Sequence, residues 1–184
     1  MILTDREIQI AIERGSISIE PRPGDVAFSS TSLDLTLDDQ LTDFNIKDDG
    51  MERIVDPSHP KFGAETTLKE VAVNHTIDKD GFLLQPGKLT LGWTKEFVNL
   101  ETTARLAARI EGKSSLARLG LAVHTTAPTI HAGFKGQIRL EMVNHGPLPI
   151  RLRPDMRICQ LIFELTLGTP DLGYKGQFDS QMAR

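Results

Sequence analysis

Short runs of alternating or continuous apolar side chains recur along the chain and predict β-strands. These runs are residues 16–19, 32–37, 82–84, 89–93, 136–144, 148–152 and 158–163. A period of two places successive side chains on opposite faces of a sheet, so each alternating run can bury one face. Proline and glycine separate the runs, as at residues 21–24 and 85–87. Many short strands joined by turns predict a mainly β fold, a sandwich or a barrel.

A helical pattern precedes the first strand. Thr4 and Glu7 have the spacing of a capping box. In this motif each of the two side chains accepts a hydrogen bond from the backbone N–H of the other residue, which has no partner within the helix. Ile8 and Ile12 then share one helical face, and Gly15 is a typical stop. The sequence therefore predicts a short helix at the start of the chain.

Residues 43–80 show little periodicity and are rich in Asp, Lys, Pro and His. We expect a long excursion there with a strand or two at most, and we assign no chemistry to it. The chain has no repeat of fixed period, which favours one domain over residues 1–184 with a C-terminal lid or tail at about 168–184.

Composition fits that single domain, with 184 residues of which 39% are hydrophobic and 25% charged. A formal net charge of −4 argues against a protein that binds nucleic-acid polymers through their phosphates, although one nucleotide could still be bound locally. The first seven residues include Asp5 and Glu7, and no stretch is apolar enough to span a membrane. We therefore expect a soluble, cytoplasmic protein.

Cys159 is the only cysteine, which excludes an intrachain disulfide and a thiolate cage for a metal. Zinc-dependent nucleobase deaminases need a P-C-x-x-C pair to hold the metal that activates water. This chain cannot supply that pair. Because Cys159 lies in an apolar run, we expect it to be a buried, small hydrophobic side chain.

Residues 112–120 break the β pattern, because Leu116 and Leu119 have helical spacing after Gly112, Lys113, Ser114 and Ser115. Free amides and hydroxyls at the start of a helix can hold a phosphate. The Walker pattern is absent, and two serines before a helix also serve as plain caps. Both interpretations stay open on the sequence pattern alone.

Glu141 follows Leu140 and precedes Met142 in the run at residues 136–144. Alternation places its carboxylate on the face opposite those two apolar side chains. That face could be solvent, or it could be a pocket in which a carboxylate passes protons.

Several motifs together closely resemble the dCTP deaminase family of the dUTPase-like superfamily. They are E-G-K-S-S-L-A-R-L-G-L at residues 111–121, V-H-T-T-A at 123–127, G-F-K-G at 133–136 and L-E at 140–141, with further matches at 29–35, 153–161 and 173–178. The resemblance covers most of the chain and is weakest over residues 43–80.

The resemblance implies a set of catalytic groups. Glu141 matches the family's glutamate that shuttles protons. Ser114 and the backbone carbonyl of Ala127 match groups that hold the attacking water near C4 of cytosine. Arg118 matches an arginine beside them that comes from a neighbouring subunit.

It also implies groups that bind the nucleotide. Lys113, Ser114 and Ser115 match the triphosphate loop, and Arg139 and Leu140 match a strand whose backbone reads the pyrimidine. Further matches to nucleotide contacts are Gln160, Tyr174 and Gln181, and His131 falls at another position of the binding site.

As a member of this family, the protein is expected to be a homotrimer with a distorted jelly-roll or β-barrel fold and short helices. Its reaction would be hydrolytic deamination of dCTP to dUTP and ammonia without zinc, supplying dUTP for dUMP and dTTP synthesis. Mg²⁺ would enter only with the triphosphate. Whether dTTP inhibits the enzyme stays open.

Two departures from the family pattern bear on function. His131 stands where relatives carry an aspartate, and in related dUTPases the matching aspartate positions a water for attack on the triphosphate. Imidazole lacks that standing charge at pH 7, so we expect deamination without further hydrolysis. His131 could equally be a turn residue without a role.

The tail differs too: relatives often end in Gln-Gly-Gln, whereas Gln181 is followed by Met182, and Tyr174 could be a packing residue.

Three functions remain to be separated. The first is a dCTP deaminase. The second is a dUTPase or a bifunctional enzyme that forms dUMP. The third is a trimer that binds nucleotide without catalysis.

Overall fold

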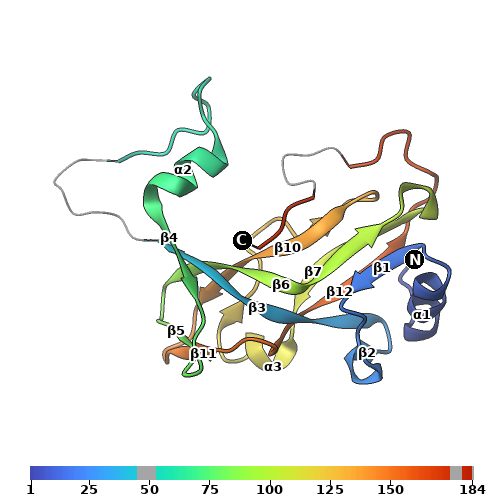
Figure 1. Cartoon of the computed structure of the whole chain (residues 1–184), viewed down its shortest axis with the longest axis horizontal. Helices are drawn as coiled ribbons and strands as arrows, with labels where there is room; N and C mark the ends of the chain where they lie inside the picture. Colours follow the sequence, from blue (N-terminus) through green and yellow to red (C-terminus); the bar gives the residue numbers. More distant parts are fainter. Residues whose placement is uncertain (45–52, 175–179, 184) are drawn as a thin grey trace.

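The first helix begins where the sequence predicts. In this computed structural model, which describes residues 1–44, 53–174 and 180–183, α1 spans Asp5–Glu13 and carries both hydrogen bonds of the Thr4–Glu7 capping box. Ile8 and Ala11 are buried, so this helix contributes one face to the core. Figure 1 shows α1 at one end of the molecule.

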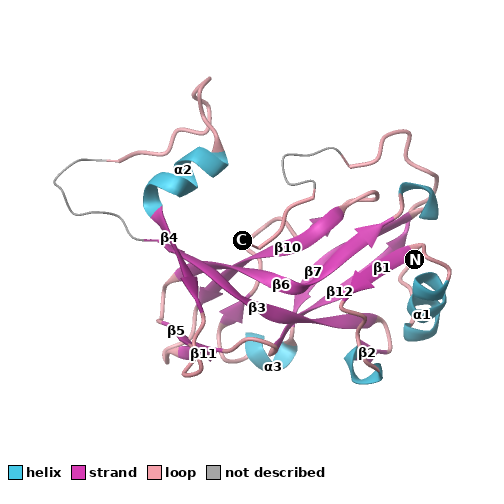
Figure 2. Ribbon diagram, viewed as in Figure 1, coloured by secondary structure: helices cyan, strands magenta, loops and turns pink. Residues whose placement is uncertain are grey.

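Antiparallel strands form most of the remaining regular structure, and the chain is mainly β as predicted (Figure 2). The strands are β1 (Ile17–Glu20), β2 (Phe28–Ser29), β3 (Ser32–Phe44), β4 (Ala72–Thr76), β5 (Phe82–Leu84), β6 (Leu89–Leu100), β7 (Leu106–Gly112), β8 (Leu121–Ala122), β9 (Thr129–Ile130), β10 (Lys135–Asn144), β11 (Ile150–Leu152) and β12 (Arg157–Leu165). Within the described residues, the main sheet has the order β8-β10-β6-β3-β12-β7-β9, and β11 pairs with β5 separately.

Irregular pairing bends the long central strands. Register shifts occur between Leu37 and Leu41 on β3, between Gln137 and Arg139 on β10, and between Arg157 and Cys159 on β12. A bulge bends its strand and increases the local twist. The sheet consequently curls into a half-barrel, with the helices at its periphery (Figures 1 and 2).

The excursion at residues 43–80 contains a helix, so the expectation of a strand or two at most was wrong. Residues 45–52 lie outside the described part, but α2 spans Ala64–Val71 and β4 follows it and pairs with β3. The helix has Gly63 at its N-cap and lacks a side-chain cap, so the sequence carries no start signal. Two short 3₁₀ turns, η1 (Asp25–Ala27) and η2 (Thr102–Ala104), and the predicted short helix α3 (Ser114–Ala117) complete the elements.

One apolar core lies inside the curl of the sheet. Its fully buried members include Leu33, Leu140, Met142 and Phe163, which come from β3, β10 and β12. Cys159 is also fully buried, which confirms the prediction for this residue. None of the described helices is long and apolar enough to cross a membrane.

Candidate active site

A cavity of about 610 Å³ lies between α2, β10, the segment before β9 and the C-terminal residues. The predicted site residues that line it are Ala127, His131, Arg139, Leu140, Glu141, Tyr174 and Gln181. They come from four separate parts of the sequence. The fold therefore brings together two of the four residues assigned to catalysis, Glu141 and Ala127, with the two on the strand assigned to base recognition, Arg139 and Leu140.

Glu141 lies on β10 between Leu140 and Met142, which are both buried in the core. Its own side chain is partly exposed and lines the cavity, as strand alternation requires. The backbone N–H of Thr125 lies 3.4 Å from Glu141 Oε2, a long hydrogen bond that ties the carboxylate to the segment carrying Ala127. The carboxylate is thus held at the cavity wall and can still accept further hydrogen bonds.

Arg139 precedes Glu141 by two residues and lines the same cavity. Its guanidinium lies 4.7 Å from the centre of the Trp93 ring, and its Nη2 donates a 2.9 Å hydrogen bond to Thr42 Oγ1. Burial lowers the pKa of the guanidinium, and the carboxylates of Glu65 and Glu141 act in the opposite direction. The side chain is therefore a partly desolvated cation beside the proposed proton-transfer residue.

Aromatic rings close one side of the cavity. His131 stacks on Tyr174 with 5.5 Å between ring centres and 12° between planes, and Phe134 lies 6.1 Å from Tyr174. The Tyr174 N–H donates to the carbonyl of Ala132. Tyr174 thus packs against the wall and also lines the cavity, so the two interpretations offered by the sequence are compatible.

The described end of the tail binds along β10. Gln137 N–H donates to Gln181 O at 2.9 Å, Gln181 Nε2 donates to Gln137 O at 2.9 Å, and Ala183 N–H donates to Gln137 Oε1 at 2.7 Å. A Cβ on Gly136 would lie 2.8 Å from Gln181 O, so only glycine leaves room for this approach. These contacts place Gln181 at the cavity. Residues 175–179 lie outside the described part.

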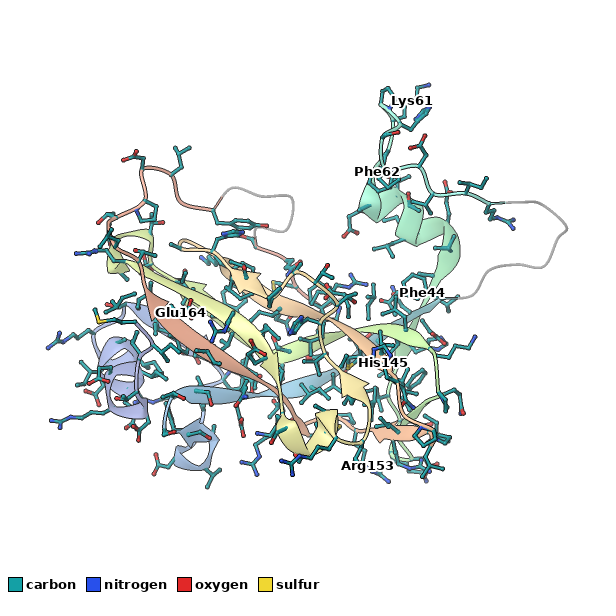
Figure 3. All side chains as sticks on the ribbon, turned by 180° about the vertical axis from the view of Figure 1, so that it is seen from behind. Phe44, Lys61, Phe62, His145, Arg153 and Glu164 are labelled. Carbon is teal, nitrogen blue, oxygen red and sulfur yellow. The ribbon has the colours of Figure 1, made fainter. Side chains whose placement is uncertain are left out.

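The opposite wall comes from the segment to which sequence analysis assigned no chemistry. The side chains of Phe44, Phe62, Leu68 and Val71 line the cavity, together with Glu65 from α2. Figure 3 shows Phe62 just before α2 and Phe44 below that helix, at the end of β3. Because this wall forms only through tertiary packing, the weak periodicity of the segment gave no signal for it.

The serine-rich turn lies elsewhere in the chain. Ser114, Ser115 and Arg118 are exposed, and Arg118 lines a second hollow of about 720 Å³ together with His145 and Leu148. Lys113 is the N-cap of α3, but its ammonium is 2.5 Å from Oδ1 of buried Asp34. Within one chain, then, the predicted triphosphate loop does not line the cavity that holds Glu141.

Gln160 also lies away from the cavity and is occupied by other partners. Its Oε1 accepts a 2.9 Å hydrogen bond from Ser32 Oγ, and its Nε2 donates to the carbonyl of Gly112 at 3.2 Å. In this arrangement Gln160 connects β12 to β3 and to the end of β7, just before α3.

The sequence profile of the dCTP deaminase-like family matches residues 2–166. The chain belongs to this family. It is 43% identical over 170 residues to a dCTP deaminase of Shewanella amazonensis, which covers 91% of this chain and 85% of that protein. A dCTP deaminase of Rhodospirillum rubrum is 40% identical over 176 residues, covering 95% of this chain and 87% of that one.

A solved structure supports the fold assignment of this dCTP deaminase-like chain. The 2′-deoxycytidine 5′-triphosphate deaminase from Agrobacterium tumefaciens superposes with a TM-score of 0.68 at 21% identity. The match covers 89% of this chain, which spans about half (48%) of that protein's length. At this identity the likeness establishes the shared fold.

Proposed function

We propose that this protein is an enzyme that deaminates dCTP by hydrolysis, giving dUTP and ammonia. The observation that carries the proposal is the Glu141 carboxylate, which lines a 610 Å³ cavity in a chain whose relatives are named dCTP deaminases. The cavity is of a size suited to a small ligand.

Glu141 performs the proton transfers in this proposal. It removes a proton from a water molecule, and the resulting hydroxide adds to C4 of the cytosine ring. Glu141 then returns a proton to the amino group, the C4–N bond breaks, and ammonia leaves while C4 keeps the oxygen. A general base or acid of this kind contributes on the order of a hundredfold to ten-thousandfold.

The water is oriented by the Ala127 carbonyl and by Ser114. Ala127 lines the Glu141 cavity, but Ser114 does not, so Ser114 and Arg118 act from a neighbouring copy of the chain. The proposal therefore includes a homotrimer whose active sites lie between subunits. Lys113 and Ser115 contribute to the same loop, which binds the triphosphate, and Gln160 supports its start.

Water activation in this proposal is zinc-independent. Mg²⁺ arrives with the substrate as the counter-ion of the triphosphate, because it prefers oxygen ligands and retains several of its waters. The proposal places the enzyme in the cytoplasm. Inhibition by dTTP is open to the same assay with dTTP added.

Product analysis tests the function directly. The protein is incubated with dCTP and Mg²⁺, and ammonia, dUTP, dUMP and pyrophosphate are each measured. Equal amounts of ammonia and dUTP support the proposal. Pyrophosphate with dUMP would instead identify a bifunctional enzyme, and binding without any product would identify a non-catalytic nucleotide-binding trimer.

His131 makes the bifunctional outcome the less favoured one. Its imidazole lines the cavity but stacks on Tyr174, and it carries no standing negative charge at pH 7 with which to position a second water. We therefore expect the reaction to stop at dUTP.

A further inference from the structure

The two residues that precede Ser114 are each held by a polar side chain from another strand. The Gly112 carbonyl accepts a 3.2 Å hydrogen bond from Gln160 Nε2 on β12, and the Lys113 ammonium donates a 2.5 Å hydrogen bond to Asp34 Oδ1 on β3. Asp34 and Gln160 are opposite each other in the register of β3 and β12. Neighbouring positions of the sheet thus fix both residues.

Asp34 places a negative charge inside the fold. Its side chain is 3% exposed, and its carboxylate lies between two cations, with Lys113 Nζ 2.5 Å from Oδ1 and Arg157 Nη1 3.3 Å from Oδ2. A buried carboxylate needs partners that compensate its charge, and removing one partner of a buried pair is costly. Lys113 is the nearer cation, so its departure to a ligand would leave Oδ1 without a partner.

The position of Lys113 sets the position of the turn that follows it. The Lys113 carbonyl accepts hydrogen bonds from the N–H groups of Leu116 and Ala117, each at 2.9 Å. Ser114 O accepts a further one from Arg118 N–H at 3.1 Å. The exposed side chains of Ser114 and Arg118 are therefore carried by a turn that is anchored at Lys113. Groups on a rigid support lose little freedom when a ligand binds.

We infer that Asp34 is a positioning residue, which through Lys113 holds the serine-rich turn in the orientation that binds the triphosphate. Lys113 is then an anchor of the turn, and its charge serves Asp34 rather than a phosphate. This inference rests on the proposed function, which assigns the triphosphate to this turn.

Replacing the buried carboxylate separates the two roles of Lys113. Asp34→Asn removes a negative charge and frees the ammonium, so dCTP would bind as tightly as before or more tightly if Lys113 were a direct phosphate ligand. Loss of positioning acts in the opposite direction, because a misplaced turn binds weakly.

We expect the Kd for dCTP to rise about tenfold or more in Asp34→Asn. The Kd for deoxycytidine, which has no phosphate, should change by less than about twofold. Calorimetry measures both constants. A Kd for dCTP equal to or below that of wild type would overturn the inference, and so would an equal rise for deoxycytidine.

Hydrogen exchange read by NMR tests the anchoring without a nucleotide. The amides of Leu116 and Ala117, which donate to Lys113 O, should exchange several-fold faster in Asp34→Asn and in Lys113→Met. Lys113→Met changes a partly exposed side chain, so it provides the same test if Asp34→Asn folds poorly. Unchanged exchange in a folded variant would show that the pair does not anchor the turn.

Asp155→Asn is the matched control, because it removes the same group from another Asp–Lys pair. Asp155 pairs with Lys95, and neither side chain is hydrogen-bonded to residues 112–118 in the described part of the chain. This variant should keep the wild-type Kd for dCTP and the wild-type exchange of the turn amides. Melting temperatures of all variants report folding.

A double-mutant cycle tests whether Asp34 acts through Lys113. Asp34→Asn and Lys113→Met break the same pair, so together they should weaken dCTP binding about as much as the stronger single variant does. Losses that add in full would show that the two residues act independently and would contradict the inference.

The tests separate this inference from the proposed function. If wild type releases no ammonia from dCTP, the proposed function fails, and the exchange of the turn amides still tests the anchoring. If wild type deaminates dCTP and Asp34→Asn binds it as tightly as wild type does, the inference alone fails.

Discussion

Strand position and burial decide which single side chains can react. Glu141 and Cys159 both lie on strands, but the carboxylate reaches a cavity, whereas the thiol points into the core with no exposed surface. Burial raises the pKa of the Cys159 thiol far above its ordinary value, since the thiolate would be an unsolvated charge. Cys159 is therefore inert, although it is the strongest nucleophile in the sequence.

Cys159 should not react with a thiol reagent such as DTNB while the protein is folded, because the thiolate form is nearly absent. One equivalent should react after denaturation, since the chain has one cysteine. Ser58→Cys, on an exposed turn, provides a second thiol that should react at once as a control. Rapid labelling of native Cys159 would contradict its burial.

Hydrogen bonds between strands hold the elements around the cavity. Buried Glu96 on β6 accepts hydrogen bonds from Thr36 N–H at 2.9 Å and Thr36 Oγ1 at 2.7 Å. Burial is the largest influence on Glu96 and raises its pKa, although the bonds from Thr36 lower it. The Glu96–Thr36 hydrogen bonds that connect β6 to β3 should therefore depend on pH.

Because the folded-state pKa of Glu96 is raised, its contribution to stability is fully present below the ordinary carboxyl pKa and is lost as pH rises through the raised value. The free energy of unfolding of wild type relative to Glu96→Gln should therefore fall as pH rises above the ordinary carboxyl pKa of about 4.3. Urea unfolding at several pH values measures this difference. Glu13→Gln, on the exposed face of α1, controls for general pH effects, and a difference that rises with pH would refute the assignment.

Gly136→Ala should release the tail from β10, because the new Cβ would meet Gln181 O at 2.8 Å and because φ at this position is +154°. The Gln137 amide, which donates to Gln181 O, should then exchange its hydrogen faster. Hydrogen exchange read by NMR measures this effect. Gly24→Ala is the control, since a Cβ there would meet nothing within 4 Å, and unchanged exchange in Gly136→Ala would argue against the tail contact.

The elements predicted correctly are those that a few neighbouring residues specify, through hydrophobic alternation or a helix cap. Alternation located β3, β6, β10 and β12, and the capping box located α1. It did not locate β7, whose inward positions include the small Ala108, nor α2, which lacks a capping side chain.

The candidate site could be predicted only in part. Alternation placed Glu141 on the face opposite Leu140 and Met142, and the structure confirms that placement. The residues of the loop, strand and tail came from the resemblance, and their roles stay predictions. The apolar wall of α2 and the stacking of Arg139 on Trp93 depend on long-range packing, which no window of sequence contains.

At the scale of the whole molecule, the proposed catalytic residues lie in two separate places on one chain. Glu141 and Ala127 line one cavity, and Arg118 lines another hollow beside α3. A homotrimer in which α3 of one protomer meets the Glu141 cavity of the next would complete each site. Activity should therefore require Glu141 from one protomer and Arg118 from its neighbour.

Mixing two inactive variants tests this dependence. Arg118→Ala and Glu141→Gln should each be nearly inactive alone, but trimers refolded from an equal mixture should regain activity at about a quarter of their sites if the two residues meet across a boundary. Ammonia release from dCTP measures the regain. No regain above the separate variants, or an active monomer in sedimentation, would show that Arg118 does not act in trans.

The most direct test of the account concerns the Glu141 carboxylate. Turnover of dCTP and the Kd for dCTP are measured in wild type and in Glu141→Gln, which keeps the shape of the side chain but removes the proton-transfer group. We predict that ammonia release falls on the order of a hundredfold or more while the Kd changes by only a few-fold. Turnover equal to that of wild type would contradict the proposed mechanism.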